Sequence, residues 1–231
     1  MKKQTLKRKR STGSQSKVPY GKPEYKKKRY TMYKAPRIGW AQEYVSTLKF
    51  FTIGSLNTVA ATTASYRLTT NAFDIDPALG GTAMPGFTEY AAFYARFRTL
   101  RATYKVEFLN REAFNILCYA GFSNSSAAVV GHTTCGQALW KTGVMGPLTG
   151  YNKCMMYDSA SIVEIAGTKQ ALYDDLFTGS TTAVGITGSG LKHMYFVIES
   201  PNAVFTATGG ADYKISISLT IQFYTPNTLA V

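Results

Sequence analysis

The side chains that could catalyse a reaction or bind a metal are few and scattered in this 231-residue chain. It has two histidines, His132 and His193, and three cysteines, Cys118, Cys135 and Cys154. His132 and Cys135 form an isolated His-x-x-Cys pair, which supplies two ligands where structural zinc takes four. No Gly-x-Ser-x-Gly elbow or P-loop is present. We therefore expect no enzyme, no catalytic residue, no metal site and no cofactor.

Positive charge is the chemistry that the sequence does supply, and it is concentrated near the N-terminus. Residues 1–37 hold 14 of the 26 Lys and Arg residues but only one of the 13 acidic residues. The whole net charge of +13 therefore lies in this segment, and residues 38–231 are neutral. Solubility does not require such segregation, whereas basic arms commonly bind nucleic acid. The expected nucleic-acid-binding cations of the arm are Lys2, Lys3, Lys7, Arg8, Lys9, Arg10, Lys17, Lys22, Lys26, Lys27, Lys28, Arg29, Lys34 and Arg37.

Aromatic residues are interspersed among these cations. Tyr20, Tyr25, Tyr30 and Tyr33 lie in the arm, and Trp40 follows it. Aromatic side chains near cations can stack on unpaired bases, so Tyr30, Tyr33 and Trp40 are also candidate nucleic-acid-binding residues. For Tyr33 and Trp40, anchoring of the arm against the rest of the protein is an equal alternative.

Two clusters of four consecutive cations are candidate nuclear-import signals. No stretch approaches the roughly 20 apolar residues that cross a bilayer, and the N-terminus lacks the apolar core of a secretory signal. We therefore expect a nuclear import receptor as a partner and no membrane insertion. The clusters are Lys7, Arg8, Lys9 and Arg10, and Lys26, Lys27, Lys28 and Arg29.

The elements that follow the arm are predicted to be strands. Residues 1–37 lack apolar periodicity and contain three prolines, so we expect a disordered arm followed by one folded domain over 38–231. Residues 213–223 and 98–110 alternate strictly between apolar and polar side chains, which is typical of half-buried strands. Five further candidate strands are 43–53, 64–70, 114–122, 153–165 and 192–200.

Long connections between these strands favour a double-sheet Greek key over a meander with tight hairpins. The longest connections, 71–88, 123–152 and 178–191, are predicted to be exterior loops. Two short helices are expected, at 88–97 with Thr88 as its cap and at 168–177. The predicted fold class is all-β, an eight-stranded antiparallel jelly-roll sandwich with short helices in its loops.

Cations also follow one face of the predicted strand 98–110. Arg98 and Arg101 could contact phosphates if this face meets a nucleic acid. They could instead pair with carboxylates across strands or subunits, and the sequence leaves both readings open. The cations are Arg96, Arg98, Arg101, Lys105 and Arg111, and the carboxylates are Glu89, Glu107 and Glu112.

The segment from Glu89 to Asn110, EYAAFYARFRTLRATYKVEFLN, carries a family likeness. It resembles the helix-into-strand signature of coat proteins from circovirus-like, or CRESS, circular single-stranded-DNA viruses. In those proteins an aromatic-rich element ending in Tyr/Phe-Arg leads into a long strand that ends in Asn. The chain length, the basic arm and the alternating last strand agree with this resemblance.

The resemblance implies an eight-stranded jelly roll, sixty copies in a T=1 icosahedral shell, and an arm that points inward. The expected function is a viral capsid protein that self-assembles and packages the genome, viral single-stranded DNA or RNA, in the virion after passage through the host nucleus. The host attachment factor is unknown. Alternatives are a satellite RNA-virus coat protein and a non-viral nucleic-acid-binding protein with a basic tail.

Overall fold

The computed structural model describes residues 41–127, 131–135, 139–182 and 185–227. The predicted arm, with its cations, Tyr30 and Tyr33, and also Trp40, lies outside the described residues. None of the helices in the described part is long and apolar enough to cross a membrane.

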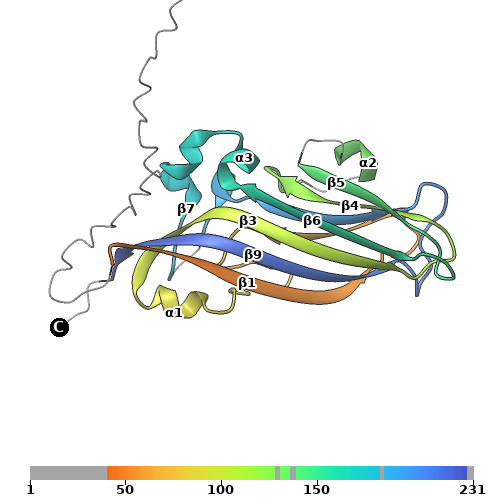
Figure 1. Cartoon of the computed structure of the whole chain (residues 1–231), viewed down its shortest axis with the longest axis horizontal. Helices are drawn as coiled ribbons and strands as arrows, with labels where there is room; N and C mark the ends of the chain where they lie inside the picture. The colour runs from red at the N-terminus through yellow and green to blue at the C-terminus, as the bar shows by residue number, and fades with distance from the viewer. Residues whose placement is uncertain (1–40, 128–130, 136–138, 183–184, 228–231) are drawn as a thin grey trace, which may run out of the picture. The chain divides into compact units, whose positions relative to one another are not determined.

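In the described part of the chain, nine strands form two antiparallel sheets (Figure 1). One sheet has the order β1-β9-β3-β6, with the short β7 also paired to β3, and the other has the order β2-β8-β4-β5. The bounds are β1 Glu43–Leu56, β2 Thr63–Thr69, β3 Tyr94–Asn110, β4 Ile116–Ser123, β5 Trp140–Met145, β6 Lys153–Ser161, β7 Thr178–Ser180, β8 His193–Glu199 and β9 Ala211–Pro226.

The order of the strands identifies the fold. Among the eight strands other than the short β7, every connection between successive strands except β4–β5 passes from one sheet to the other. Strands that are distant in the sequence, such as β1 and β9, therefore become neighbours. Two four-stranded sheets connected in this way are a jelly roll. The predicted fold class is confirmed.

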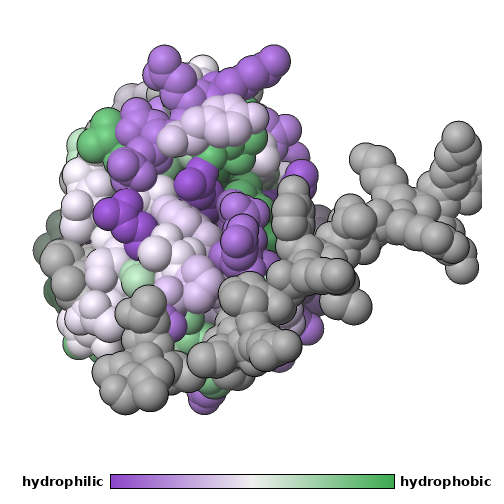
Figure 2. Space-filling model, turned by 90° about the vertical axis from the view of Figure 1, so that its left-hand side faces the viewer, coloured by the Kyte–Doolittle hydropathy of each residue, from purple (hydrophilic) through white to green (hydrophobic). Residues whose placement is uncertain are grey.

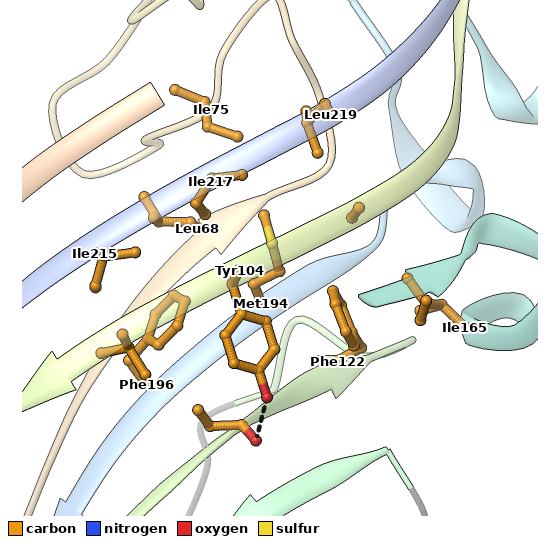
Figure 3. Packing of buried hydrophobic residues seen from close by; sticks show 14 of the residues in the cluster. Leu68, Ile75, Tyr104, Phe122, Ile165, Met194, Phe196, Ile215, Ile217 and Leu219 are labelled. Carbon is orange, nitrogen blue, oxygen red and sulfur yellow. Dashed lines mark hydrogen bonds between the residues drawn. The ribbon is translucent and has the colours of Figure 1, made fainter. Parts of the chain in front are cut away.

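The core lies between the two sheets, as the period-two pattern predicts. On β9 the buried side chains are those of alternate residues, Ile215, Ile217, Leu219, Ile221 and Phe223. Tyr104 of β3 reaches across the core, and its hydroxyl donates a hydrogen bond to the Ala120 carbonyl of β4 at 2.9 Å (Figure 3). The ring of Tyr104 packs against Phe122 and Phe196 of the opposite sheet. Both sheets thus bury one face against the other.

The helices are shorter than the sequence predicts. The predicted helix 88–97 is wrong beyond its first turns, because α1 spans Phe87–Ala91 and β3 already begins at Tyr94. Phe97 is buried on β3 opposite Phe223 of β9, so sheet pairing prevails over the helical spacing of the aromatic residues. Thr88 is not the cap. Gly86 occupies that position with a left-handed backbone, and no side chain caps the helix.

Two other boundaries also differ from the prediction. β6 ends at Ser161, where a capping box between Ser161 and Glu164 starts α3, Ile162–Ala166. The predicted helix 168–177 is two 3-10 turns, η1 Lys169–Leu172 and η2 Asp175–Phe177, because Asp174 caps a new turn by accepting a bond from the Leu176 amide. The predicted loops 123–152 and 178–191 contain short elements: α2 Gly131–Thr134, β5, β7 and η3 Gly188–Gly190.

Candidate nucleic-acid interface

The surface of the β1-β9-β3-β6 sheet that points away from the core, here called the outer face, carries most of the cations of the described body. Its side chains are those that alternate with the buried residues of each strand. Although residues 38–231 are neutral, seven cations and three acids lie on this face. The cations are Lys49, Arg96, Arg98, Arg101, Lys105, Lys153 and Lys214, and the acids are Glu43, Glu107 and Asp212. The face is therefore net positive and suited to a polyanion.

The register brings cations from different strands together. Lys105 of β3 is opposite Ser216 of β9, and the neighbouring pair on the same two strands is Glu107 and Lys214. These four residues line a shallow depression in the outer face. Two lysines and a serine of this lining can contact a phosphate group, and the fourth lining residue, Glu107, is an acid that lowers the net charge of the depression to +1.

The two predicted cations of β3 differ in how they are presented. Arg101 is exposed, and its guanidinium donates to the Ser159 hydroxyl of β6 at 3.2 Å. Arg98 is half-buried, donates to the Leu172 carbonyl of η1, and lies over the Tyr224 ring with its guanidinium carbon 4.9 Å from the ring centre. Arg101 can therefore meet a ligand on the outer face, whereas Arg98 holds η1 against the sheet.

The carboxylates proposed as partners of these cations have other contacts. Glu107 Oε1 lies 2.7 Å from Lys153 Nζ. This hydrogen bond, together with the positive charges of the nearby lysines, lowers the pKa of Glu107. Glu112 is buried and accepts hydrogen bonds from the backbone of the β8–β9 loop, while Glu89 accepts one from Thr88. Among the described residues, no carboxylate lies within 4 Å of the Arg101 or Lys105 side-chain nitrogens.

The remaining two arginines of this region form exposed ion pairs. Arg96 lies 3.5 Å from Asp175 of η2, and Arg111 lies 3.3 Å from Asp212 of β9. Exposed pairs of this kind contribute little stability. Both guanidinium groups can exchange a carboxylate for a phosphate at small cost.

Sequence reasoning missed three cations of the outer face: Lys49, Lys153 and Lys214. Lys214 occupies a polar position of a strand whose alternation was recognised, so the signal for its exposure was present, whereas Lys49 lies in the predicted strand 43–53, for which no alternation was noted. Which strands pair, and therefore which cations share one face, depends on contacts between residues more than 100 positions apart, such as Lys49 with Ser218. Local periodicity does not contain this information.

The histidines and cysteines do not assemble a catalytic or metal site in the described part of the chain. His132 Nδ1 lies 2.8 Å from Glu199, and burial raises the pKa of the adjacent Cys135 to about 12, so its thiol is protonated at neutral pH. Cys118 and Cys154 meet between the sheets, where their mutual hydrogen bond raises the pKa of Cys118 and lowers that of Cys154. Within the described residues no group of three or more potential metal ligands occurs.

One end of the sandwich is seen in Figure 2, the end where β1 and β3 begin. The coloured residues there are mainly hydrophilic or neutral, and hydrophobic ones occur in small separate areas. Several of the largest exposed apolar side chains lie instead on the outer face: Val45, Phe51, Ile53, Met155 and Tyr157. The outer face thus combines positive charge with exposed apolar and aromatic groups.

No family model and no curated protein matches the chain. Solved structures of viruses have a similar fold. A semi-empty virus-like particle of the giant freshwater prawn Macrobrachium rosenbergii nodavirus is 8% identical, with a TM-score of 0.49 over 80% of this chain and 95% of that chain. Cocksfoot mottle virus is 13% identical, with a TM-score of 0.46 over 80% and 96%. Tobacco necrosis virus is 12% identical, with a TM-score of 0.45 over 82% and 85%. Likeness at this level concerns the fold alone.

Proposed function

We propose that the chain is a viral capsid protein, in which the jelly roll builds a closed icosahedral shell and the basic arm packages the genome. The observation that carries this proposal is the distribution of charge. A +13 arm precedes a neutral jelly roll whose cations gather on the outer face of one sheet. Only residues 38–42 separate the arm from β1, which is an edge strand of that same sheet.

The arm and the outer face would act on the same polymer. Lysine and arginine residues that neutralise phosphates release counterions, so binding depends little on base sequence and weakens steeply as salt rises. Repulsion among arms opposes assembly of empty shells until a polyanion screens it. The neutral body can then associate without net repulsion, and closed symmetry ends growth at a finite particle, sixty copies in the simplest case.

We propose circular single-stranded DNA as the genome of this shell. The support is the resemblance of the segment Glu89–Asn110 to coat proteins of circular single-stranded-DNA viruses. An RNA-virus coat is the alternative. The viral chains of similar fold come from RNA viruses, but their likeness concerns the fold and does not choose between the two genomes. Import through the clusters 7–10 and 26–29 and residence in the host nucleus belong to the DNA-virus hypothesis, because the resemblance implies them.

Gradient sedimentation of the full-length protein tests the proposal. Absorbance at 260 and 280 nm is read across the fractions. We expect a fast, narrow peak with excess absorbance at 260 nm, which indicates a closed particle that contains nucleic acid. Nuclease digestion of the extracted polymer, with DNase in one sample and RNase in another, identifies the genome class.

The second candidate, a non-viral nucleic-acid-binding protein with a basic tail, predicts a different sedimentation profile. Such a protein would sediment slowly, near its mass of 25.3 kDa, and would stay unassembled after DNA or RNA is added. That result would overturn the capsid proposal and retain nucleic-acid binding.

A further inference from the structure

One row of residues crosses the outer face from edge to edge. Phe51 of β1 is opposite Ser216 of β9, Ser216 is opposite Lys105 of β3, and Lys105 is opposite Tyr157 of β6. The row therefore reads aromatic, small, cation, aromatic across four adjacent strands. With strands about 4.8 Å apart, the two rings are roughly 14 Å apart.

Both rings of this row are solvent-exposed. Phe51 is 54% exposed and Tyr157 is 64% exposed. The Lys214 ammonium lies 5.7 Å from the centre of the Phe51 ring, so one cation already accompanies one of the rings. Phe51 and Ile53 are exposed neighbours on β1, as are Met155 and Tyr157 on β6, and such groups of exposed apolar side chains are typical of contact sites.

Small side chains form the floor between the rings. The outward residues of β9 at the centre of the sheet are Ser216, Ser218 and Thr220. The depression lined by Lys105, Glu107, Lys214 and Ser216 lies in this floor. Larger side chains on β1, β3 and β6 flank it. The centre of the outer face thus carries small side chains on β9, with larger cationic and aromatic side chains on the neighbouring strands.

The charge of the face selects among possible occupants. A second copy of the chain that packed on the same face would bring seven cations against seven, with three acids on each side to compensate. A polyanion meets the same face without that repulsion. Exposed rings add nothing to the binding of phosphates alone, but they stack on bases whose faces are open. Duplex DNA hides its base faces, whereas an unpaired strand offers them.

We propose that Phe51 and Tyr157 form a stacking subsite for the unpaired bases of a single-stranded nucleic acid, with Lys105 and Lys214 on its phosphates. The inference rests on the proposed function, in which the outer face of this sheet lines the inside of the shell. It names which form of nucleic acid that face binds. Each ring takes one base, and Lys105 between them meets the backbone that joins the stacked nucleotides. Stacking on a ring does not depend on base identity, so the subsite accepts any sequence.

The test compares the full-length wild type with the double variant Phe51→Leu/Tyr157→Leu. Leucine keeps an apolar side chain at both exposed positions, so folding should not depend on the change. Three fluorescently labelled probes of equal length are titrated: oligothymidylate, an abasic oligodeoxynucleotide with the same phosphates, and duplex DNA. We expect the double variant to bind oligothymidylate about tenfold or more weakly, with abasic and duplex binding unchanged and the same salt slope.

Tyr173→Leu is the matched control. Tyr173 is 82% exposed but follows η1, off the outer face. Its replacement should leave oligothymidylate binding at the wild-type level, which separates the subsite from a general effect of removing an exposed ring.

The outcomes separate this inference from the proposed function. If the double variant binds oligothymidylate as the wild type does, or loses abasic binding equally, the stacking subsite is wrong and the packaging proposal stands. If the double variant binds every probe normally but no longer forms particles, a second copy occupies the face and the inference is overturned. If wild type binds no probe, the proposed function itself fails.

Discussion

His193, on β8, shows how a single buried side chain can control stability. It is 5% exposed, and its Nδ1 is a buried atom without a hydrogen-bond partner among the described residues. Burial, reinforced by the positive charges of Arg67 and Lys192, lowers the pKa of His193 to about 4. The folded protein therefore keeps this imidazole neutral under conditions in which the unfolded chain protonates it.

Acid sensitivity follows from this shift. The unfolded imidazole takes up a proton below about pH 6.5, whereas the folded one resists it until about pH 4. The free energy of unfolding should therefore fall as pH drops from about 6.5 to about 4, by an amount on the order of 3 kcal/mol from this residue. Urea unfolding of the full-length protein at several pH values measures it.

The variant His193→Gln isolates the effect of this residue from that of titrating carboxylates. Glutamine does not ionise, so the variant should lose less stability than wild type between pH 6.5 and pH 4. Parallel stability curves for the two proteins would show that His193 does not titrate differently in the folded state.

At the scale of elements, Glu112 connects three loops at one end of the sandwich. Its carboxylate accepts hydrogen bonds from the amides of Thr206 and Gly210 in the β8–β9 loop, each at 2.8 Å. Its backbone carbonyl accepts one from Leu148 in the β5–β6 loop, and its amide donates to the Asn110 side chain at the end of β3. A charge buried in this way is stabilised by hydrogen bonds rather than by an opposite charge.

Glu112→Gln should loosen these loops without changing the fold. The amide retains one acceptor oxygen but places donors beside backbone N–H groups, so the free energy of unfolding should fall by roughly 1–3 kcal/mol. Hydrogen exchange should accelerate at the Thr206 and Gly210 amides. Glu89→Gln is the control, because Glu89 is exposed on α1. Equal stability of the two variants would show that the buried carboxylate does not fix the loops.

The elements also show where local sequence is a sufficient guide. Alternation in 98–110 and 213–223 predicted β3 and β9, because each strand buries one face. The segment 88–97 was misassigned because aromatic residues at helical spacing are equally compatible with a short helix followed by a strand. The Ser-x-x-Glu capping box at Ser161 was present in the sequence, yet β-branched residues around it favoured a longer strand.

For the chain taken in full, genome packaging by the arm and shell formation by the jelly roll are assigned to separable parts. All described strands lie between Glu43 and Pro226, so deletion of residues 2–37 should leave a folded jelly roll. The truncated protein should retain β-type circular dichroism but no longer package nucleic acid in particles, because the net charge of +13 is removed and only the weaker contacts of the outer face remain. The full-length protein in the same gradient is the control. Loss of the β signal on truncation would contradict the two-part organisation.

Charge segregation, the β class and the alternation of side chains along each strand could all be predicted from residue types and their order. These are local properties, set by residue type and by the two-residue period of a strand. The alternation on β1 already shows that Phe51 faces away from Leu48. The absence of a recognisable catalytic motif was likewise a matter of local spacing.

Which strands share a sheet could not be predicted in this way and follows from the fold. Phe51, Lys105 and Tyr157 are far apart in sequence and form one row because β9 pairs with both β1 and β3, and β3 pairs with β6. The tertiary structure also brings η1 beside Arg98, whose guanidinium donates to the Leu172 carbonyl. Strand order and register depend on burial between distant segments, and a one-residue slip would turn every side chain of a strand to the opposite face.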